Sequence, residues 1–395
     1  MSRLEELIQK QRQFPIVDLH TVVKRKCSGA TPAKGNREYY DGGNIPWLRT
    51  QDVRFNEIVE VESYITEKAV NETAVKWIPE NCVIVAISGA SAGRCAINKI
   101  RTTTNQHCLN LEIDSSKALY KYIYYCIANQ YQELLSRKQG ARGDLNSSLI
   151  LSLKIPLPPL EVQREIVRIL DHFTELTTEL TTELTVRKKQ YEYYRDQLLK
   201  HNPFSKPMKL GDIGPISMCK RIMKAETSSS GDVPFYKIGT FGKEANAFIS
   251  NETFQKYKEK YPYPKKGELL ISAAGTIGRI VVFDGSPSYF QDSNIVWIRN
   301  DESVVLNRYL YYCYQLQPWQ ASSGGTISRL YNDNIRKAII PVPPLEEQQR
   351  IVDILDRFDT LCNDLTAGLP AEIEARQKQY EYYRDKLLTF EPLAD

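Results

Sequence analysis

The sequence predicts an α+β chain in which two α/β domains are separated by two long antiparallel (coiled-coil) helices, with an internal pseudo-twofold repeat. Three observations lead to this fold class. Blocks near the middle of the chain recur near its end, a helical pattern of about forty residues follows the first of these blocks, and strand-like apolar runs are confined to the segments between them. Repetition at a long period indicates a repeated structural unit.

The duplication is clearest in two short motifs. IPLPPL at residues 155–160 recurs as IPVPPL at residues 340–345, a shift of 185 positions, and QYEYYRD at residues 190–196 recurs at residues 379–385, a shift of 189. The blocks between these motifs match only weakly. From this alternation we expect five parts: a short N-terminal helix (1–13), a first α/β domain (14–154), a central helical spacer (155–205), a second α/β domain (206–339) and a C-terminal helical spacer (340–395).

The N-terminal segment is predicted to be a short polar helix. Its residues, MSRLEELIQKQRQF, lack the apolar core of a secretory signal, and nowhere do eighteen apolar residues follow one another, so we expect no membrane span. The eight cysteines form no CxxC pair and there are only four histidines. We therefore expect reduced thiols, a cytoplasmic protein and no metal site.

Strands and helices within the two α/β domains follow from their apolar runs. Short apolar runs predict buried strands at 83–88, 108–113, 269–272, 280–283 and 295–299. A Tyr-rich helix beginning at Leu119 is expected to end the first domain, and another beginning at Asn307 is expected to end the second. Tyrosines in these positions suit packing surfaces better than base stacking, because they recur at helical spacing.

The two spacers are predicted to be long helices that pack on each other. From Leu160 to about Lys200 the apolar residues recur at steps of three and four, and about forty residues give a rod of roughly 60 Å. Its partner, from Leu345 to about Leu388, should break at Gly368–Pro370. The residues expected at the spacer or at an interface with another subunit are Leu170, Phe173, Leu176, Leu180, Leu184, Tyr191, Tyr194, Leu355, Phe358, Tyr380 and Tyr383.

Residues 174–185 consist of three copies of the tetrapeptide TELT. Each copy adds about 6 Å to a helix, which is the length of one to two base pairs. One interpretation is a ruler of adjustable length between two DNA-reading domains. The alternative is a repetitive helix that faces solvent.

Signatures of catalysis are missing. The sequence contains no GxxxxGK[ST], GxSxG, HExxH or GxGxxG motif, and no Asn- or Asp-Pro-Pro-aromatic tetrad. We therefore predict that the chain has no catalytic residue. The net charge of +4 is only mildly basic and permits a nucleic-acid partner without requiring one.

Two repeated Gly-Arg loops suggest contacts with DNA. SGASAGR at residues 88–94 and SAAGTIGR at residues 272–279 each follow a predicted strand, and their arginines lie 185 positions apart. Arginine can read guanine with two hydrogen bonds or grip a phosphate. Solvated loop arginines in tight turns remain an alternative. The candidate DNA contacts are Arg49, Gln51, Ser91, Arg94, Gln106, Arg142, Lys237, Thr240, Thr276, Arg279, Gln291 and Arg329.

Two other functions would each account for part of this sequence. A self-contained nuclease or methyltransferase would need a catalytic region for which this chain has no room. A coiled-coil scaffold that binds no DNA would explain the long helices, but not two divergent α/β domains with recurring Gly-Arg loops.

The sequence resembles the specificity subunits of type I restriction-modification enzymes. The resemblance rests on the tandem organisation, the PLPPLExQ motif followed by ILD and Phe173, the TELT repeats and QYEYYRDQLL at residues 190–199. It covers the whole chain in organisation and is most specific in residues 155–200 and 340–390. The four-residue repeats resemble those of the IC group, which carries TAEL-like repeats.

The resemblance implies a DNA-binding subunit of a restriction system. In that family, two target-recognition domains each read one half of a split, asymmetric double-stranded DNA site. The helical spacers set the unread gap and bind two methyltransferase subunits, while a restriction subunit translocates and cleaves DNA. S-adenosylmethionine, ATP and Mg²⁺ would then be used by partner subunits and no cofactor by this chain. Residues 14–154 and 206–339 would be the target-recognition domains.

Overall fold

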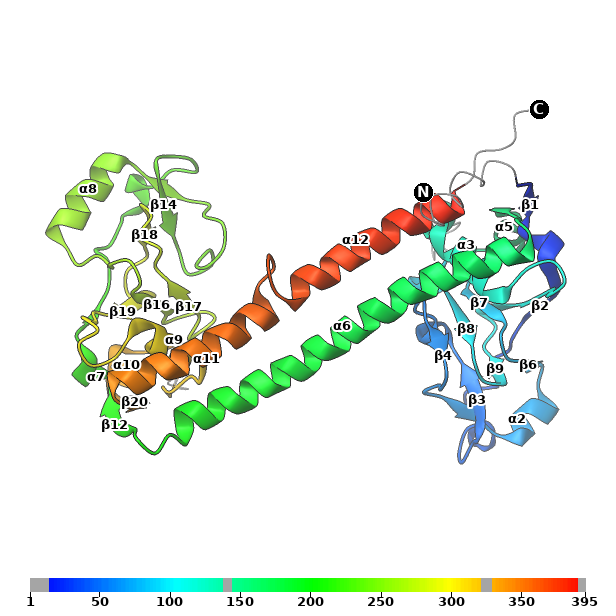
Figure 1. Cartoon of the computed structure of the whole chain (residues 1–395), viewed down its shortest axis with the longest axis horizontal. Coiled ribbons are helices and arrows are strands. Elements are labelled where there is room, and N and C mark those ends of the chain that lie inside the picture. Colours follow the sequence, from blue (N-terminus) through cyan, green and yellow to red (C-terminus); the bar gives the residue numbers. More distant parts are fainter. Residues whose placement is uncertain (1–13, 138–143, 321–328, 390–395) are drawn as a thin grey trace. The chain divides into compact units, whose positions relative to one another are not determined.

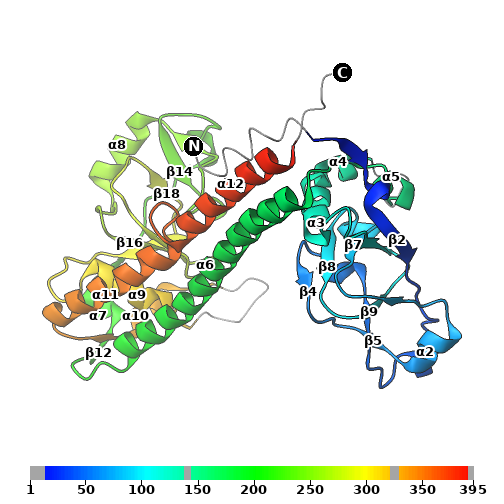
Figure 2. The same ribbon diagram turned by 45° about the vertical axis from the view of Figure 1, so that its right-hand side comes forward.

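The computed structural model describes residues 14–137, 144–320 and 329–389. The chain divides into two compact units, Met1–Thr181 with Glu372–Asp395, and Thr182–Ala371. Each unit joins one mixed α/β head to parts of the long helices (Figures 1 and 2). The predicted fold class is confirmed, whereas the predicted N-terminal helix (1–13) and Arg142 lie outside the described residues.

The first head spans residues 16–156 and contains two sheets in its described part, a five-stranded one ordered β2-β10-β7-β8-β4 and a four-stranded one ordered β5-β3-β9-β6. A separate antiparallel pair, β1 with β11, closes the head next to the long helices. Its strands are β1 (Ile16–Asp18), β2 (Val23–Ser28), β3 (Ile45–Leu48), β4 (Glu57–Ile58), β5 (Tyr64–Ile65), β6 (Trp77–Ile78), β7 (Val83–Ala86), β8 (Cys95–Asn98), β9 (Thr102–Thr104), β10 (Cys108–Ile113) and β11 (Lys154–Pro156). Its helices are α2 (Glu67–Glu72), α3 (Tyr120–Asn129), α4 (Tyr131–Ser136) and α5 (Ser147–Leu151).

Helix α3 covers one face of the five-stranded sheet. It buries Tyr122, Ile123 and Cys126 on one face, the spacing expected when a helix packs on a sheet. Strand β7 is buried along its whole length, which explains why its sequence is continuously apolar. Burial of apolar area at about 25 cal/mol per Å² is the main stabilising contribution of this layer.

The second head spans residues 206–342 and repeats this plan. Its described part holds a four-stranded sheet ordered β13-β19-β16-β17, a three-stranded sheet ordered β15-β14-β18 and the antiparallel pair β12 with β20. Its strands are β12 (Lys206–Lys209), β13 (Ile216–Ser217), β14 (Val233–Tyr236), β15 (Phe248–Ile249), β16 (Leu269–Ser272), β17 (Ile280–Val282), β18 (Tyr289–Phe290), β19 (Ile295–Ile298) and β20 (Ile339–Val342). Its helices are α7 (Leu210–Ile213), α8 (Asn251–Lys260), α9 (Asn307–Gln315) and α10 (Asn332–Lys337).

The predicted long helices are present. Helix α6 runs without interruption over Leu160–Lys200, and the C-terminal segment forms α11 (Leu345–Asn363) and α12 (Leu369–Leu388). The predicted break is confirmed: at Gly368 a Cβ atom would lie 2.4 Å from the carbonyl oxygen of Thr360, so only glycine fits that turn. Pro370 is accommodated in the first turn of α12, where its missing N–H costs nothing.

Aromatic pairs join the long helices within each unit. In the first unit Phe173 of α6 stacks on Tyr383 of α12, with ring centroids 5.5 Å apart. In the second unit Phe358 of α11 stacks on Tyr194 of α6, with centroids 5.7 Å apart. These pairs occupy equivalent positions of the sequence repeat, so each unit contains the same helix–helix contact.

A buried glutamine ties each head to its helix. The side chains of Gln163 and Gln348 are fully buried, and their carbonyl oxygens accept hydrogen bonds at 2.9 Å from the backbone N–H groups of Leu119 and Leu306. Each amide nitrogen donates to two backbone carbonyl oxygens, those of Lys117 and Pro158 in the first unit and of Val304 and Pro343 in the second. The glutamine of the PPLExQ motif therefore fixes where the head meets the helix.

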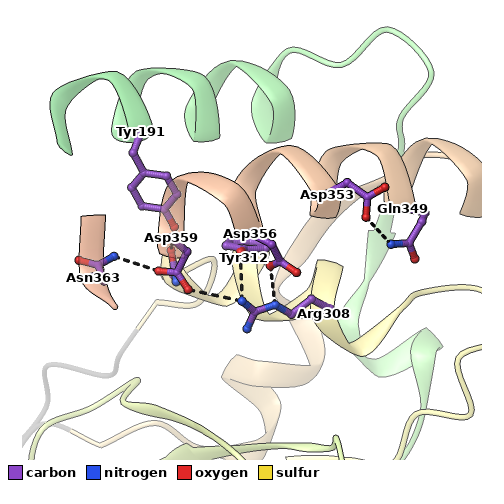
Figure 3. Close-up of polar contacts among 9 residues, drawn as sticks. Tyr191, Arg308, Tyr312, Gln349, Asp353, Asp356, Asp359 and Asn363 are labelled. Carbon is purple, nitrogen blue, oxygen red and sulfur yellow. Dashed lines mark hydrogen bonds and ion pairs between the residues drawn. The ribbon is translucent and has the colours of Figure 1, made fainter. Parts of the chain in front are cut away.

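Ion pairs strengthen the same junctions. In the second unit Arg308 of α9 donates to Asp356 of α11 at 2.7 Å, and the Tyr312 hydroxyl bonds the same carboxylate (Figure 3). In the first unit Lys121 of α3 pairs with Asp171 of α6 at 2.9 Å. Because both junctions are built from equivalent contacts, the repeat seen in the sequence is also present in the structure.

Candidate nucleic-acid interface

Three loops meet at one end of the first head. They are Arg49 after β3, residues 87–94 after β7, and residues 105–107 between β9 and β10. The N–H of Asn105 donates to the oxygen of Leu48 at 3.0 Å, and the N–H of Ile87 donates to the oxygen of His107 at 2.9 Å. These bonds bring the sequence-predicted Arg49 and Gln106 together at the end where the loop of Ser91 and Arg94 begins. We call these segments the first loop cluster.

The first loop cluster borders a hollow of about 530 Å³. Lys34, Arg49 and His107 lie along it, and no carboxylate does. The residues that line it are Thr31, Lys34, Tyr40, Trp47, Arg49, Ser63, Tyr64, Asn105, Gln106 and His107. A concave surface with two cations, Lys34 and Arg49, and no acid favours the electronegative groups of a nucleic acid, either phosphate oxygens or the guanine acceptors of the major groove.

Arg49 is held beside this hollow with an unsatisfied donor. Its Nε atom is buried and has no hydrogen-bond partner among the described residues, and its Cζ atom lies 6.0 Å from the centre of the Trp47 ring. Its backbone N–H donates to the Asp52 carboxylate at 2.8 Å. Burial raises the pKa of Asp52, and the hydrogen bond from Arg49 opposes that rise. A buried donor without a partner is uncommon in a folded protein.

The other predicted contacts of the first head differ in how available they are. Gln106 is exposed, and its side chain bonds Thr31 and lies 3.2 Å from the His107 ring nitrogen. Gln51 is exposed but donates to Glu62 at 2.9 Å, so it would have to exchange that bond for a base. The side chain of Arg94 is half-buried in the tight turn that begins at Ser91.

The second head brings together the equivalent loops, which we call the second loop cluster. The N–H of Gln291 donates to the oxygen of Tyr236 at 2.9 Å, and the N–H of Ala273 donates to the oxygen of Asn294 at 2.7 Å. Residues 237–240, 272–279 and 291–294 therefore meet as their counterparts do in the first head. Lys237 and Thr276 are exposed there.

Several predicted contacts of the second cluster also support its loops. The Gln291 side-chain oxygen accepts from the N–H of Ile238 at 2.9 Å, and Arg279 donates to the oxygen of Phe241 at 2.6 Å. Arg329 donates to the oxygen of Ser293 at 3.2 Å. Thr240 bonds within its own turn. Because these groups hold neighbouring loops in place, they would act on a nucleic acid mainly by shaping the surface.

Sequence reasoning missed Lys34, Tyr64 and His107. They line the hollow in the first head but have no counterparts in the repeat, so comparison of the two halves could not single them out. It also missed Arg221, which is exposed and pairs with Asp292 beside Gln291 at 2.9 Å. The polar, glycine-containing segment around Lys34 was the one feature of the sequence that could have indicated a binding loop there.

The predicted spacer residues fall into two groups. Those at the start of each spacer lie inside a head, since Leu170 and Leu355 are fully buried in the apolar cores of the first and second heads. The others lie along the helices: Phe173, Tyr383, Tyr194 and Phe358 form the stacked pairs, Tyr191 is buried, and Leu176, Leu180, Leu184 and Tyr380 are half-buried. Leu170 and Leu355 therefore lie on the predicted spacer helices, at the point where each helix packs on its head.

No cluster of metal-ligating side chains and no helix long and apolar enough to cross a membrane occurs in the described ranges.

The chain is similar to known proteins over most of its length. The family model for the type I restriction modification DNA specificity domain matches residues 13–187 and 205–375. A putative type I restriction enzyme specificity subunit of Haemophilus influenzae is 54% identical over 304 residues, covering 75% of this chain and 78% of that protein. The EcoR124I/EcoR124II specificity subunit of Escherichia coli is 35% identical over 302 residues, covering 70% and 72%.

Two solved structures share the fold. The type I restriction-modification S subunit of M. genitalium has a TM-score of 0.57 and 15% identity, covering 95% of this chain and 96% of that one. A chain from a study of complex assembly and conformational transition in a type I restriction-modification system has a TM-score of 0.60 and 17% identity, covering 95% and 97%.

Proposed function

Because this chain belongs to the family of type I restriction-modification DNA specificity subunits, we propose that its two heads each read one half of a split, asymmetric DNA site through their loop clusters. One observation carries this proposal: the same three loops meet in both heads, joined by equivalent backbone hydrogen bonds. The side chains on those loops differ between the heads, so the two half-sites differ as well.

The chemistry of each side chain decides whether we assign it to a phosphate contact, a base contact or support of a loop. Exposed lysines such as Lys34 and Lys237 grip phosphates, which sets the register without reading sequence. Arg49 and Gln106 of the first head face base edges in the major groove, because guanidinium and carboxamide groups can each form two hydrogen bonds to one base. Arg279, Gln291 and Arg329 hold the second cluster in shape. Ser91, Arg94, Thr240, Thr276 and Gln51 remain candidate contacts at or beside these loops, and Arg142, which lies outside the described residues, remains a candidate from the sequence alone.

We further propose that this chain is not itself catalytic. Two methyltransferase subunits would bind its helices and receive flipped adenines, and restriction subunits would join that complex in the cytoplasm. S-adenosylmethionine, ATP and Mg²⁺ would serve those partners. Purified chain given DNA, Mg²⁺ and a labelled methyl donor should transfer no label, and turnover by the chain alone would refute this part of the proposal.

The reading role of Arg49 can be tested by mapping methylated sites genome-wide. Arg49→Ala should relax one base position in one half-site, with a loss of about 1–3 kcal/mol in discrimination at that position, and leave the other half-site unchanged. Lys34→Ala is the matched control, since loss of a phosphate contact should weaken binding about equally for all sequences. A motif unaltered by Arg49→Ala would remove Arg49 from the base-reading set.

A further inference from the structure

The segment that follows β13 reaches the second loop cluster and brings a cation to it. Arg221 of this segment donates from its Nε atom to the Asp292 carboxylate at 2.9 Å. The first head is built in a similar way, because the segment that follows β2 carries Thr31 and Lys34, and Thr31 bonds Gln106 of the first loop cluster. In each head, the chain that leaves an edge strand therefore lies beside the loop cluster.

Arg221 differs from the other arginines at the second loop cluster in what its guanidinium contacts. Arg279 and Arg329 are half-buried, and each donates from a terminal nitrogen to a backbone oxygen of a neighbouring loop. The side chain of Arg221 is 65% exposed, and in the described part of the chain neither of its terminal nitrogens has a hydrogen bond. These N–H groups are therefore available to a ligand.

Asp292 is a fixed anchor for that arginine. Its side chain is only 18% exposed, and the Ser293 hydroxyl lies 3.3 Å from the same carboxylate oxygen that accepts from Arg221. The backbone beside it is held as well, because Arg329 donates to the oxygen of Ser293 at 3.2 Å. Since the carboxylate binds Nε, it orients the guanidinium without occupying the two terminal nitrogens.

This ion pair is too exposed to serve mainly as a stabilising contact. Exposed pairs contribute little to stability, because water screens both charges and the side chains lose conformational freedom. A carboxylate beside DNA also repels phosphates, so Asp292 would weaken a purely electrostatic grip by Arg221. The pair instead supplies a planar pair of donors held in one orientation, which discrimination between bases requires.

We propose that Arg221 reads a guanine in the half-site of the second head, and that Asp292 is the positioning residue that orients its guanidinium. The two terminal nitrogens would donate to O6 and N7 of guanine, whose major-groove edge presents two neighbouring acceptors. This inference rests on the proposed function, in which the second loop cluster lies against DNA. It adds a specific base and a specific pair of residues to that function.

The test is methylome sequencing of strains whose complete restriction-modification system carries a variant of this chain. Arg221→Ala should relax one G·C position of the motif, lowering discrimination there by about fivefold or more. The relaxed position should lie in the half-site that Arg49→Ala leaves unchanged. Competition binding measures the same discrimination where a variant methylates too slowly to map, using the assembled methyltransferase complex and duplexes with each of the four bases at that position.

Asp292→Asn separates the positioning role from a charge effect. If Asp292 acted only through its charge, its loss would strengthen binding to every sequence, because a repulsion of phosphates is removed. The positioning role predicts reduced discrimination at the same G·C position that Arg221→Ala relaxes. The double substitution should lose no more discrimination than Arg221→Ala does, since Asp292 acts through that arginine. Additive losses, or an unchanged motif in Asp292→Asn, would exclude the positioning role.

Lys220→Ala is the matched control. Lys220 is exposed, carries the same charge as its neighbour Arg221, and has its Nζ atom 5.3 Å from the centre of the Tyr261 ring. Its loss should leave the motif unchanged. If Arg221→Ala binds every sequence more weakly but keeps the wild-type motif, Arg221 is a phosphate contact, and the inference is wrong while the proposed function stands. If wild type recognises no split site, the proposed function itself fails.

Discussion

At the scale of single residues, the most informative positions are the two buried glutamines. Each satisfies one backbone donor and two backbone acceptors at the point where a head meets its helix. Buried polar groups are stable only when they are paired, so these amides act as fixed connectors rather than as general packing. Gln163 and Gln348 thereby hold each head in one orientation on its own helix.

Gln348→Leu should lower the free energy of unfolding by about 2–4 kcal/mol, because each buried group left without a partner costs roughly 1–3 kcal/mol. Urea unfolding followed by circular dichroism measures the change. Gln349→Leu is the control: Gln349 is exposed, donates to Asp353 at 2.8 Å (Figure 3), and should change stability by less than about 0.5 kcal/mol. Equal effects of the two substitutions would mean that the buried amide has no special role.

Some of the candidate DNA contacts could be predicted from the sequence, and the local bonds of others could not. Arg49 could be chosen from the sequence because it follows the aromatic Trp47, and Gln106 because it recurs as Gln291 at the shift of 185 positions; the structure places Arg49 and Gln106 at one hollow. The supporting bonds of Arg279 and Gln291 could not be foreseen, because they depend on which carbonyl or N–H a neighbouring loop presents. Their DNA contacts therefore remain predictions.

At the scale of elements, α6 explains how a threonine-rich repeat remains helical. Thr174, Thr178 and Thr181 donate from their hydroxyls to the carbonyl oxygens four residues earlier, at 2.7–3.0 Å. Threonine is a poor helix former partly because its hydroxyl competes for backbone groups, and here the competition is resolved within the helix. The repeat can therefore vary in number without ending the helix.

Deleting residues 178–181 should shorten the unread gap of the recognised site by one or two base pairs and leave both half-sites unchanged. The deletion removes about 6 Å of helix and rotates the C-terminal part of α6 by about 40° about the helix axis. The next TELT copy moves into the vacated place, so Glu183 takes the position of Glu179. Methylome sequencing of a strain carrying the deletion measures the gap, and an unchanged gap would exclude the ruler interpretation.

Element prediction succeeded where the apolar pattern was distinct and failed where strands were too short to carry one. The long helices follow from apolar periodicity over many residues, and strands such as β7 and β16 follow from short, uninterrupted apolar runs. The second, smaller sheet of each head was not predicted, because strands such as β5 and β6 are two residues long and carry no periodic signal. Their pairing is set by tertiary contacts instead.

At the scale of the whole molecule, the duplication means that one junction design serves two heads. Gln163 and Gln348, the Lys121–Asp171 and Arg308–Asp356 ion pairs, and the two aromatic stacks are equivalent in geometry. The loop clusters, in contrast, differ in almost every exposed side chain. The residues proposed to read DNA are thus separate from the residues that attach each head to its helices. We therefore expect that one head can replace the other.

Replacing residues 14–154 with a second copy of residues 206–339 should give a chain that recognises a symmetric site, an inverted repeat of the second half-site. The inserted head brings the backbone groups of Val304 and Leu306, which Gln348 already binds, into reach of Gln163 in the same geometry. Methylome sequencing reads the result directly. A folded, methylating chimera that still recognises two different half-sites would show that the spacers contribute to base reading, because nothing else in such a chain distinguishes its two ends.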